Sequence, residues 1–206
     1  MVFNFLQSLA HDPEIRGATI GKQLFFILAA LIVFCSIMSA CTGVEPATQE
    51  EVKMVLSLSS TAFEEEDKIP VTYTCDGQDI SPPLVWGDPP QVTGVFALIV
   101  DDPDAPGGVF THWVLFNLPA TFHQLGEGIP AQEQLENGTL QGKNDFSRIG
   151  YGGPCPPHGR AHRYRFTIYA LDQSVDLKPG SSKKQLLDAM KGHILAQGQL
   201  IGTYQR

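Results

Sequence analysis

The sequence predicts a mainly β fold in which most strands are antiparallel and one or two helices lie on the outside. Short apolar runs rich in β-branched and aromatic residues recur between clusters of Gly, Pro and Asp, which is typical of strands and their turns. No helical pattern alternates with these runs, which argues against a doubly wound α/β sheet. A length of 206 residues suits one domain with an appendage.

The first segment, residues 1–41, predicts export and attachment to a membrane. Lys22 is followed by a long uncharged apolar run that ends at Met38-Ser39-Ala40-Cys41. A positive flank, an apolar stretch and small residues before a cut are typical of a secretory signal. A Cys directly after Ser-Ala also resembles a bacterial lipoprotein box, in which Cys41 would be lipidated. An uncleaved membrane anchor and a buried core helix are the alternatives.

Residues 42–51 lack apolar periodicity and predict a spacer, so we expect the folded domain to span residues 52–206. Within residues 52–58 apolar side chains recur at every second position, at Val52, Met54, Leu56 and Leu58, which predicts a strand with one buried face. Three further strands are expected at Val95–Val100, His112–Leu118 and Tyr164–Leu171.

One long helix is expected near the end of the chain. Ser182 and Gln185 form a capping box after Pro179-Gly180. The apolar residues that follow share one helical face, and they are Leu186, Leu187, Met190, Ile194 and Leu195. This pattern predicts a helix that ends near Gly198, followed by a closing strand over Leu200–Tyr204.

Charge and cysteine content limit the partners of the domain. The formal net charge of −8 makes nucleic acid an unfavourable partner, so any bound anion must be held by local geometry. Cys75 and Cys155 are the two cysteines of the predicted domain. In an exported domain they can form one disulfide, and two free thiols are the alternative.

Polar residues gather in two stiff loops, 101–108 and 150–159, each followed by a strand that begins near a histidine. The histidines lack a recognisable zinc spacing, and no Gly-x-Ser-x-Gly motif of a serine hydrolase occurs. General acid–base chemistry by an Asp and a His stays open. The remaining option is a binding site in which His and Tyr donors grip a phosphate or carboxylate, with neither metal nor cofactor.

Three motifs carry a resemblance to a known family. They are Asp102-Pro103-Asp104-Ala105-Pro106, Gly-Pro-Cys-Pro-Pro at 153–157, and His162-Arg163-Tyr164. Residues 53–206 resemble the phosphatidylethanolamine-binding protein family, in its bacterial and archaeal Raf-kinase-inhibitor-like (YbhB/YbcL-type) branch. The resemblance implies a Greek-key antiparallel β-sandwich with one large and one small sheet. It also implies a surface pocket for phosphate-like groups, including the phosphorylethanolamine headgroup.

The resemblance implies a ligand site of ten residues. They are Asp102, Asp104, Pro106, His112, Trp113, Tyr151, Cys155, Pro156, His162 and Tyr164. The two histidines would donate to the anion, and Asp102 would orient a histidine or meet an amine. Arg163 alternates with its neighbours along a strand and is therefore expected to point away.

We expect a non-catalytic binding protein for a small anion or a phospholipid headgroup, exported and attached to a membrane through its N-terminal segment. One alternative is an inhibitor of a protease or kinase that acts through its surface. Another is a hydrolase or lyase that uses the same pocket. Bacterial relatives are often dimers, so a homodimer is a further expectation.

Overall fold

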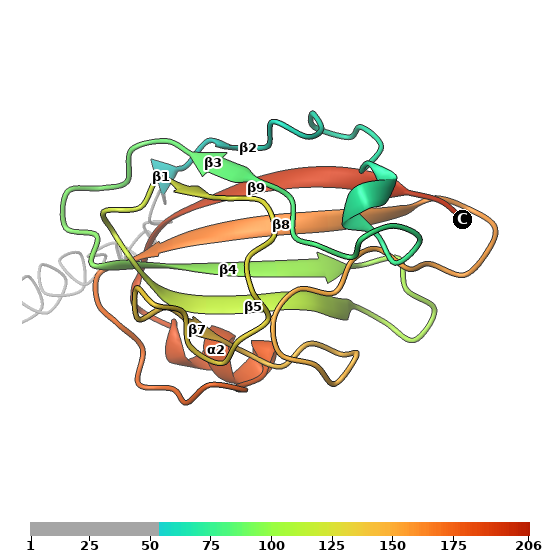
Figure 1. Ribbon diagram of the computed structural model, residues 1–206. Helices are drawn as coiled ribbons and strands as arrows, with labels where there is room; N and C mark the ends of the chain where they lie inside the picture. Colours follow the sequence, from blue (N-terminus) through green and yellow to red (C-terminus); the bar gives the residue numbers. More distant parts are fainter. Residues whose placement is uncertain (1–53) are drawn as a thin grey trace, which may run out of the picture. The chain divides into compact units, whose positions relative to one another are not determined.

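The computed structural model describes residues 54–206, which form two β-sheets and a helix outside them (Figure 1). The large sheet has the order β1-β9-β8-β4-β5-β7 and the small sheet the order β2-β3-β6. The predicted mainly β class with one large and one small sheet is confirmed. The expected signal or anchor segment 1–41, with Cys41, and the spacer 42–51 lie outside the described residues. Within residues 54–206, no helix is long and apolar enough to cross a membrane.

The elements follow one another along the chain with these bounds. The large sheet contains β1 (Met54–Val55), β4 (Val95–Asp102), β5 (Phe110–Pro119), β7 (Leu140–Gln141), β8 (His162–Leu171) and β9 (Ile194–Tyr204). The small sheet contains β2 (Leu58–Ser59), β3 (Leu84–Trp86) and β6 (Gln124–Leu125). The helical elements are the 3-10 turn η1 (Val71–Tyr73) and the helix α2 (Lys183–Ala189).

The large sheet has a Greek-key connection. Strands β4, β5 and β7 lie side by side in the sheet in the order in which they occur along the chain. Strand β8 then returns to pair with the free side of β4. The pairings of β4, β5, β7, β8 and β9 are antiparallel, whereas β1 pairs with β9 in parallel and makes the sheet mixed. This topology places the end of β4 beside the starts of β5 and β8, and the two polar loops of the sequence therefore meet at one edge of the fold.

Alternating side chains of the long strands build two core layers. Along β4, Phe96, Leu98 and Val100 face the small sheet, whereas Ala97 and Ile99 face the opposite side of the large sheet. Helix α2 covers that opposite side, beside β5 and β7 in Figure 1. Both faces of β4 and β5 are therefore buried, which explains why these two strands are almost continuously apolar.

A β-bulge in β5 re-aims one side chain. Val100 pairs with Trp113 and Asp101 with Thr111, so His112 has no partner in β4. Trp113 belongs to the core layer on the small-sheet side, while Thr111 lies near Lys183 of α2 on the other side. The extra residue lets His112 join Trp113 on the small-sheet side, against the ring of Tyr164. Strict alternation would have put it on the helix side.

Two predicted elements differ from the structure. The single strand expected over residues 52–58 is replaced by β1 and β2, because Leu56 donates to the Gln197 carbonyl and the chain then crosses to the small sheet. Leu56 and Leu58 are buried as predicted, but Met54 is 52 % exposed. Val52 lies outside the described residues.

The predicted helix is also too long. The Ser182–Gln185 capping box is confirmed, but α2 ends at Ala189, and the following turn contains Gly192 at φ +80°. Ile194 and Leu195 therefore belong to β9 and not to the helix. Gly198 does not cap a helix; a Cβ there would overlap the Leu56 carbonyl, so glycine permits the close approach of β9 to the segment between β1 and β2. The closing strand over Leu200–Tyr204 is confirmed as the end of β9.

Candidate functional site

The two polar loops enclose a small cavity at the edge of the large sheet. Its volume is about 160 Å³. The lining residues are Asp102, Ala105, Pro106, Phe110, His112, Phe146, Cys155, Pro156, Pro157 and His162. Six of the ten residues expected at the site are among them. The wall is mainly apolar, no Lys or Arg lines it, and its polar groups converge from β4, β5 and β8.

His162 and Asp102 form a buried pair at the cavity. The Nδ1 atom of His162 lies 2.7 Å from Oδ2 of Asp102, and the two side chains are 5 % and 4 % exposed. The other carboxylate oxygen accepts from the backbone N–H of Asp104. Both oxygens of Asp102 are therefore engaged by the protein, which favours the orienting role expected for it over contact with a ligand amine.

His112 is held by a backbone carbonyl. Its Nδ1 lies 2.6 Å from the carbonyl oxygen of Gly152, and the Gly152 N–H donates back to the carbonyl of His112. Burial lowers the pKa of His112, although the Gly152 carbonyl and the Asp102 carboxylate oppose that shift. Burial therefore favours the neutral form of the ring. Within residues 54–206, Nε2 of neither cavity histidine has a hydrogen-bond partner, so both atoms are left for a ligand.

Two phenylalanines of the site were not predicted. Phe146 stacks edge-on against His112 and Phe110 at centroid distances of 5.3 and 4.7 Å. Together they cover one side of the histidine ring and make the cavity apolar. The signal for Phe146 was its place in a polar loop, where a large apolar side chain needs a partner. Phe110 lies two residues before the predicted strand His112–Leu118, and no motif marked it.

Asp104 was expected in the cavity and does not line it. Its carboxylate accepts from Nε and Nη2 of Arg163 at 2.9 and 2.8 Å, and also from the Arg163 backbone N–H. Arg160 donates to the Asp104 carbonyl. The hydrogen bond and charge of Arg163 hold the pKa of Asp104 well below its usual range. Asp104 thus attaches the loop 101–108 to the start of β8 from outside the cavity, and the exposed Arg163 points away as expected.

Three further expected residues belong to the buried core and do not line the cavity. The indole of Trp113 donates to Gln141, and the hydroxyl of Tyr151 donates to the Tyr73 carbonyl. Tyr164 packs against the His112 ring at a centroid distance of 5.2 Å. Its buried hydroxyl has no hydrogen-bond partner among the described residues, and burial together with the Asp102 charge raises its pKa. Of the three, Tyr164 contacts a cavity histidine, whereas Trp113 and Tyr151 pack against each other in the core.

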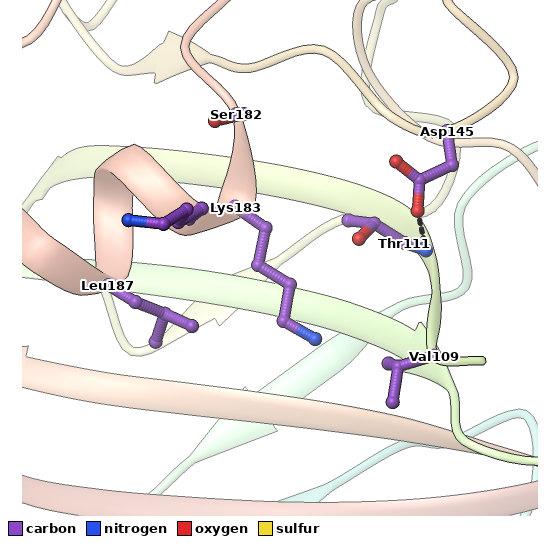
Figure 2. Close-up of a pocket in the computed structure, with 7 residues that line it drawn as sticks. Val109, Thr111, Asp145, Ser182, Lys183 and Leu187 are labelled. Atoms are coloured by element: carbon purple, nitrogen blue, oxygen red, sulfur yellow. Dashed lines mark hydrogen bonds between the residues drawn. The ribbon is translucent and has the colours of Figure 1, made fainter.

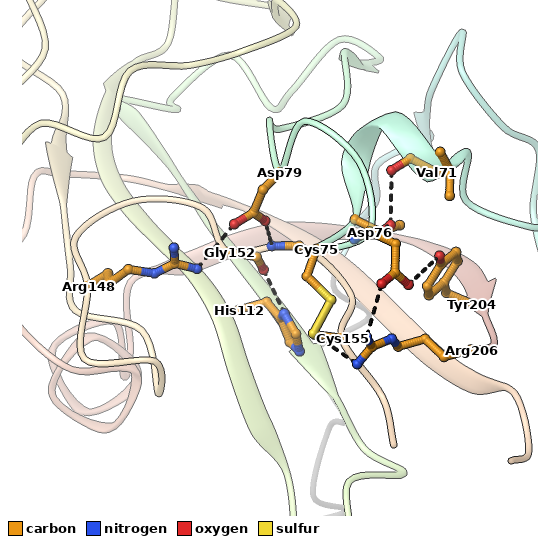
Figure 3. The surroundings of a disulfide bond; sticks show 12 residues. Val71, Cys75, Asp76, Asp79, His112, Arg148, Gly152, Cys155, Tyr204 and Arg206 are labelled. Carbon is orange, nitrogen blue, oxygen red and sulfur yellow. Dashed lines mark hydrogen bonds and ion pairs between the residues drawn. A yellow bond between two sulfur atoms is a disulfide. The ribbon is translucent and has the colours of Figure 1, made fainter. Parts of the chain in front are cut away.

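A disulfide between Cys75 and Cys155 fixes one wall of the cavity (Figure 3). The sequence left the choice between bridge and free thiols open. Cys155 lines the cavity, as do Pro156 and Pro157 directly after it. The bridge attaches this wall to the loop after η1, where the Cys75 N–H also donates to the Pro154 carbonyl. The nearby Arg206 guanidinium pairs with Asp76.

A second and larger hollow, of about 360 Å³, lies beside α2 on the other face of the sheet (Figure 2). Its principal polar groups are already paired. Asp145 accepts from the Thr111 N–H at 2.6 Å, and Lys183 lies 2.6 Å from the Asp101 carboxylate. None of the ten expected site residues lines it. The smaller cavity is therefore the better candidate, because it has unpaired ring nitrogens.

Comparisons with known proteins identify relatives of the whole described domain. The family model of the phosphatidylethanolamine-binding protein matches residues 59–205. A UPF0098 protein of Methanothermobacter thermautotrophicus is 50 % identical over 151 residues, which cover 73 % of this chain and 99 % of the relative. A UPF0098 protein of Pyrococcus horikoshii is 48 % identical over 190 residues, 91 % of each chain.

Two solved structures share the fold. A Chlamydia trachomatis protein, described as a homologue of the phosphatidylethanolamine-binding protein, has a TM-score of 0.68 and 41 % identity, and the match covers 74 % of this chain and 98 % of that one. Escherichia coli YbcL, described as a new member of the mammalian family, has a TM-score of 0.68 and 30 % identity over 73 % of this chain and 98 % of its own. The chain therefore belongs to the phosphatidylethanolamine-binding protein family.

Proposed function

We propose that this protein is a non-catalytic binding protein that holds a small phosphate-like anion between His112 and His162. Membership of the family supports a binding function. The observation that carries the proposal is the cavity itself, where two buried histidines have their Nδ1 atoms fixed and their Nε2 atoms without a protein partner. A fixed donor or acceptor binds a ligand at little cost in conformational entropy.

The size and composition of the cavity limit the ligand. A volume of about 160 Å³ is well below the roughly 300–1,000 Å³ of pockets for drug-sized molecules. It suits a phosphate or carboxylate group with a short substituent. Apolar walls strengthen hydrogen bonds to such a group, because the local dielectric constant is lower than that of water.

The disulfide also bears on where the protein acts. Disulfides persist mainly in oxidising compartments, so the Cys75–Cys155 bridge supports the proposal of an exported domain. The proposed lipid attachment at Cys41 is tested by the mass of the mature protein from membranes. A mass that includes residues 1–40 would argue against cleavage and lipidation there.

The binding proposal is tested by calorimetric titration of the full-length protein with phosphate, O-phosphorylethanolamine and acetate. The double variant His112→Ala/His162→Ala should lose binding, because the ligand would lose both ring partners. His193→Ala is a matched control. His193 also pairs with an aspartate, Asp172, at 3.0 Å, but it is exposed and lies at the opposite end of the β8–β9 hairpin. Equal affinity of the double variant and the control would refute the site.

A further inference from the structure

The two cavity histidines are held by different chemical groups, and this difference bears on the ligand. A carbonyl oxygen can only accept a hydrogen bond. Because Nδ1 of His112 lies 2.6 Å from the Gly152 carbonyl, Nδ1 carries the hydrogen and Nε2 of the neutral ring is an acceptor. The Gly152 N–H also donates to the backbone carbonyl of His112, and this second hydrogen bond holds the Gly152 carbonyl in place beside the ring.

His162 faces a carboxylate instead. Asp102 accepts from Nδ1 at 2.7 Å, and a carboxylate, unlike a carbonyl, also pairs well with a protonated ring. His162 can therefore donate from Nε2 to an anion. The cavity presents one acceptor, at His112, and one donor, at His162.

The charges around the cavity disfavour a doubly charged ligand. Asp102 is the carboxylate on the wall, and no Lys or Arg lines it. The guanidinium groups around the cavity are paired with other carboxylates. Arg163 pairs with Asp104, Arg206 with Asp76, and Arg148, which lies over the Phe146 ring, with Asp79. Asp145, next to Phe146 in the chain, accepts a hydrogen bond from the Thr111 N–H. A dianion would thus find no Lys or Arg on the wall, and the charge of a protonated His162 is already compensated by Asp102.

We infer that the pocket selects an oxyanion that still carries a hydroxyl, such as the monoanion of a phosphate monoester or a phosphonate. One ligand oxygen accepts from Nε2 of His162, and the ligand O–H donates to Nε2 of His112. This inference rests on the proposed function and narrows its ligand class. An intact phospholipid headgroup is a phosphodiester without such a hydroxyl, so it leaves Nε2 of His112 buried and unpaired, which weakens binding.

The experiment compares methylphosphonate with dimethylphosphinate by calorimetry on the full-length protein at mildly acidic pH. Both probes are then monoanions of nearly equal size, and they differ by one hydroxyl in place of one methyl. We expect methylphosphonate to bind about tenfold more tightly, which is the effect of one hydrogen bond to a buried group. Raising the pH should weaken methylphosphonate more than dimethylphosphinate, because only methylphosphonate becomes a dianion.

His112→Asn is the discriminating variant. Its amide N–H can still donate to the Gly152 carbonyl, but it lacks the acceptor at Nε2, so the ratio of the two affinities should fall close to one. Equal affinities in the wild type, or tighter binding of dimethylphosphinate, would overturn the inference and leave the anion pocket standing. Failure of both probes and of phosphate to bind would overturn the proposed function and this inference with it. The wild-type comparison decides the matter even if the variant is unstable.

Discussion

Removing the Cys75–Cys155 disulfide should cost a large part of the stability of the domain. The bridge closes a loop with a sequence separation of 80 residues. In the chain-entropy model, a closed loop of this length restricts the unfolded chain by about 15 cal/mol/K, or about 4.5 kcal/mol at 25 °C. A domain of this kind has a free energy of unfolding of about 5–15 kcal/mol, so the double variant Cys75→Ala/Cys155→Ala is expected to be marginal.

The assay is equilibrium unfolding in urea, with and without a reductant. The wild type should lose about 4–5 kcal/mol of unfolding free energy when it is reduced. The double variant should start near that lower value and not respond to the reductant, which makes it the control for effects of the reductant elsewhere. A double variant within about 1 kcal/mol of the oxidised wild type would refute the reasoning, because the bridge would then not restrict the unfolded chain as calculated.

Three further predictions concern particular contacts. Asp104→Asn should lower anion affinity severalfold in calorimetry, because it loosens the attachment of the loop 101–108 to β8, yet change the urea midpoint little, since Arg163 is 60 % exposed; unchanged affinity would argue against a positioning role for Asp104. Burial lowers the pKa of His112, so the unfolded chain takes up its proton first as the pH falls below about 6.5, and stability should drop by up to about 1.4 kcal/mol per pH unit. In His112→Asn, the urea midpoint should depend less on pH in this range than in the wild type. The same pH dependence in both proteins would contradict the lowered pKa of His112. Gly198→Ala should lower the thermal midpoint by several degrees, because its Cβ would overlap the Leu56 carbonyl; a midpoint at the wild-type value would show that this close approach relaxes.

Strands β4 and β5 were predictable because both of their faces are buried, so that they are almost continuously apolar. In β8, buried apolar residues alternate with more exposed ones, which also indicates a strand. The strands of the small sheet contain two or three residues each, too few for a period to be recognised. Ile194 and Leu195 fitted a helical face, but two apolar residues fit a strand equally well, and only pairing with β8 decides between the two.

The candidate site could be predicted in composition but not in detail. The sequence motifs predicted that Asp102, His112 and His162 belong to one site. The sheet topology explains why they meet, because the end of β4 lies beside the starts of β5 and β8. The bulge that turns His112 toward the small sheet depends on strand register, which a single sequence does not reveal. Asp104 was misplaced for a related reason, since its partner Arg163 follows 59 residues later.

The central claim is that Nε2 of His112 and of His162 contacts a bound anion. The most direct test follows the ¹⁵N resonances of the histidine rings during titration of the full-length protein with methylphosphonate. The account predicts saturable shifts at His112 and His162 with a common dissociation constant, and no shift at His193. Saturable binding that leaves both cavity histidines unshifted would contradict it and place the anion elsewhere.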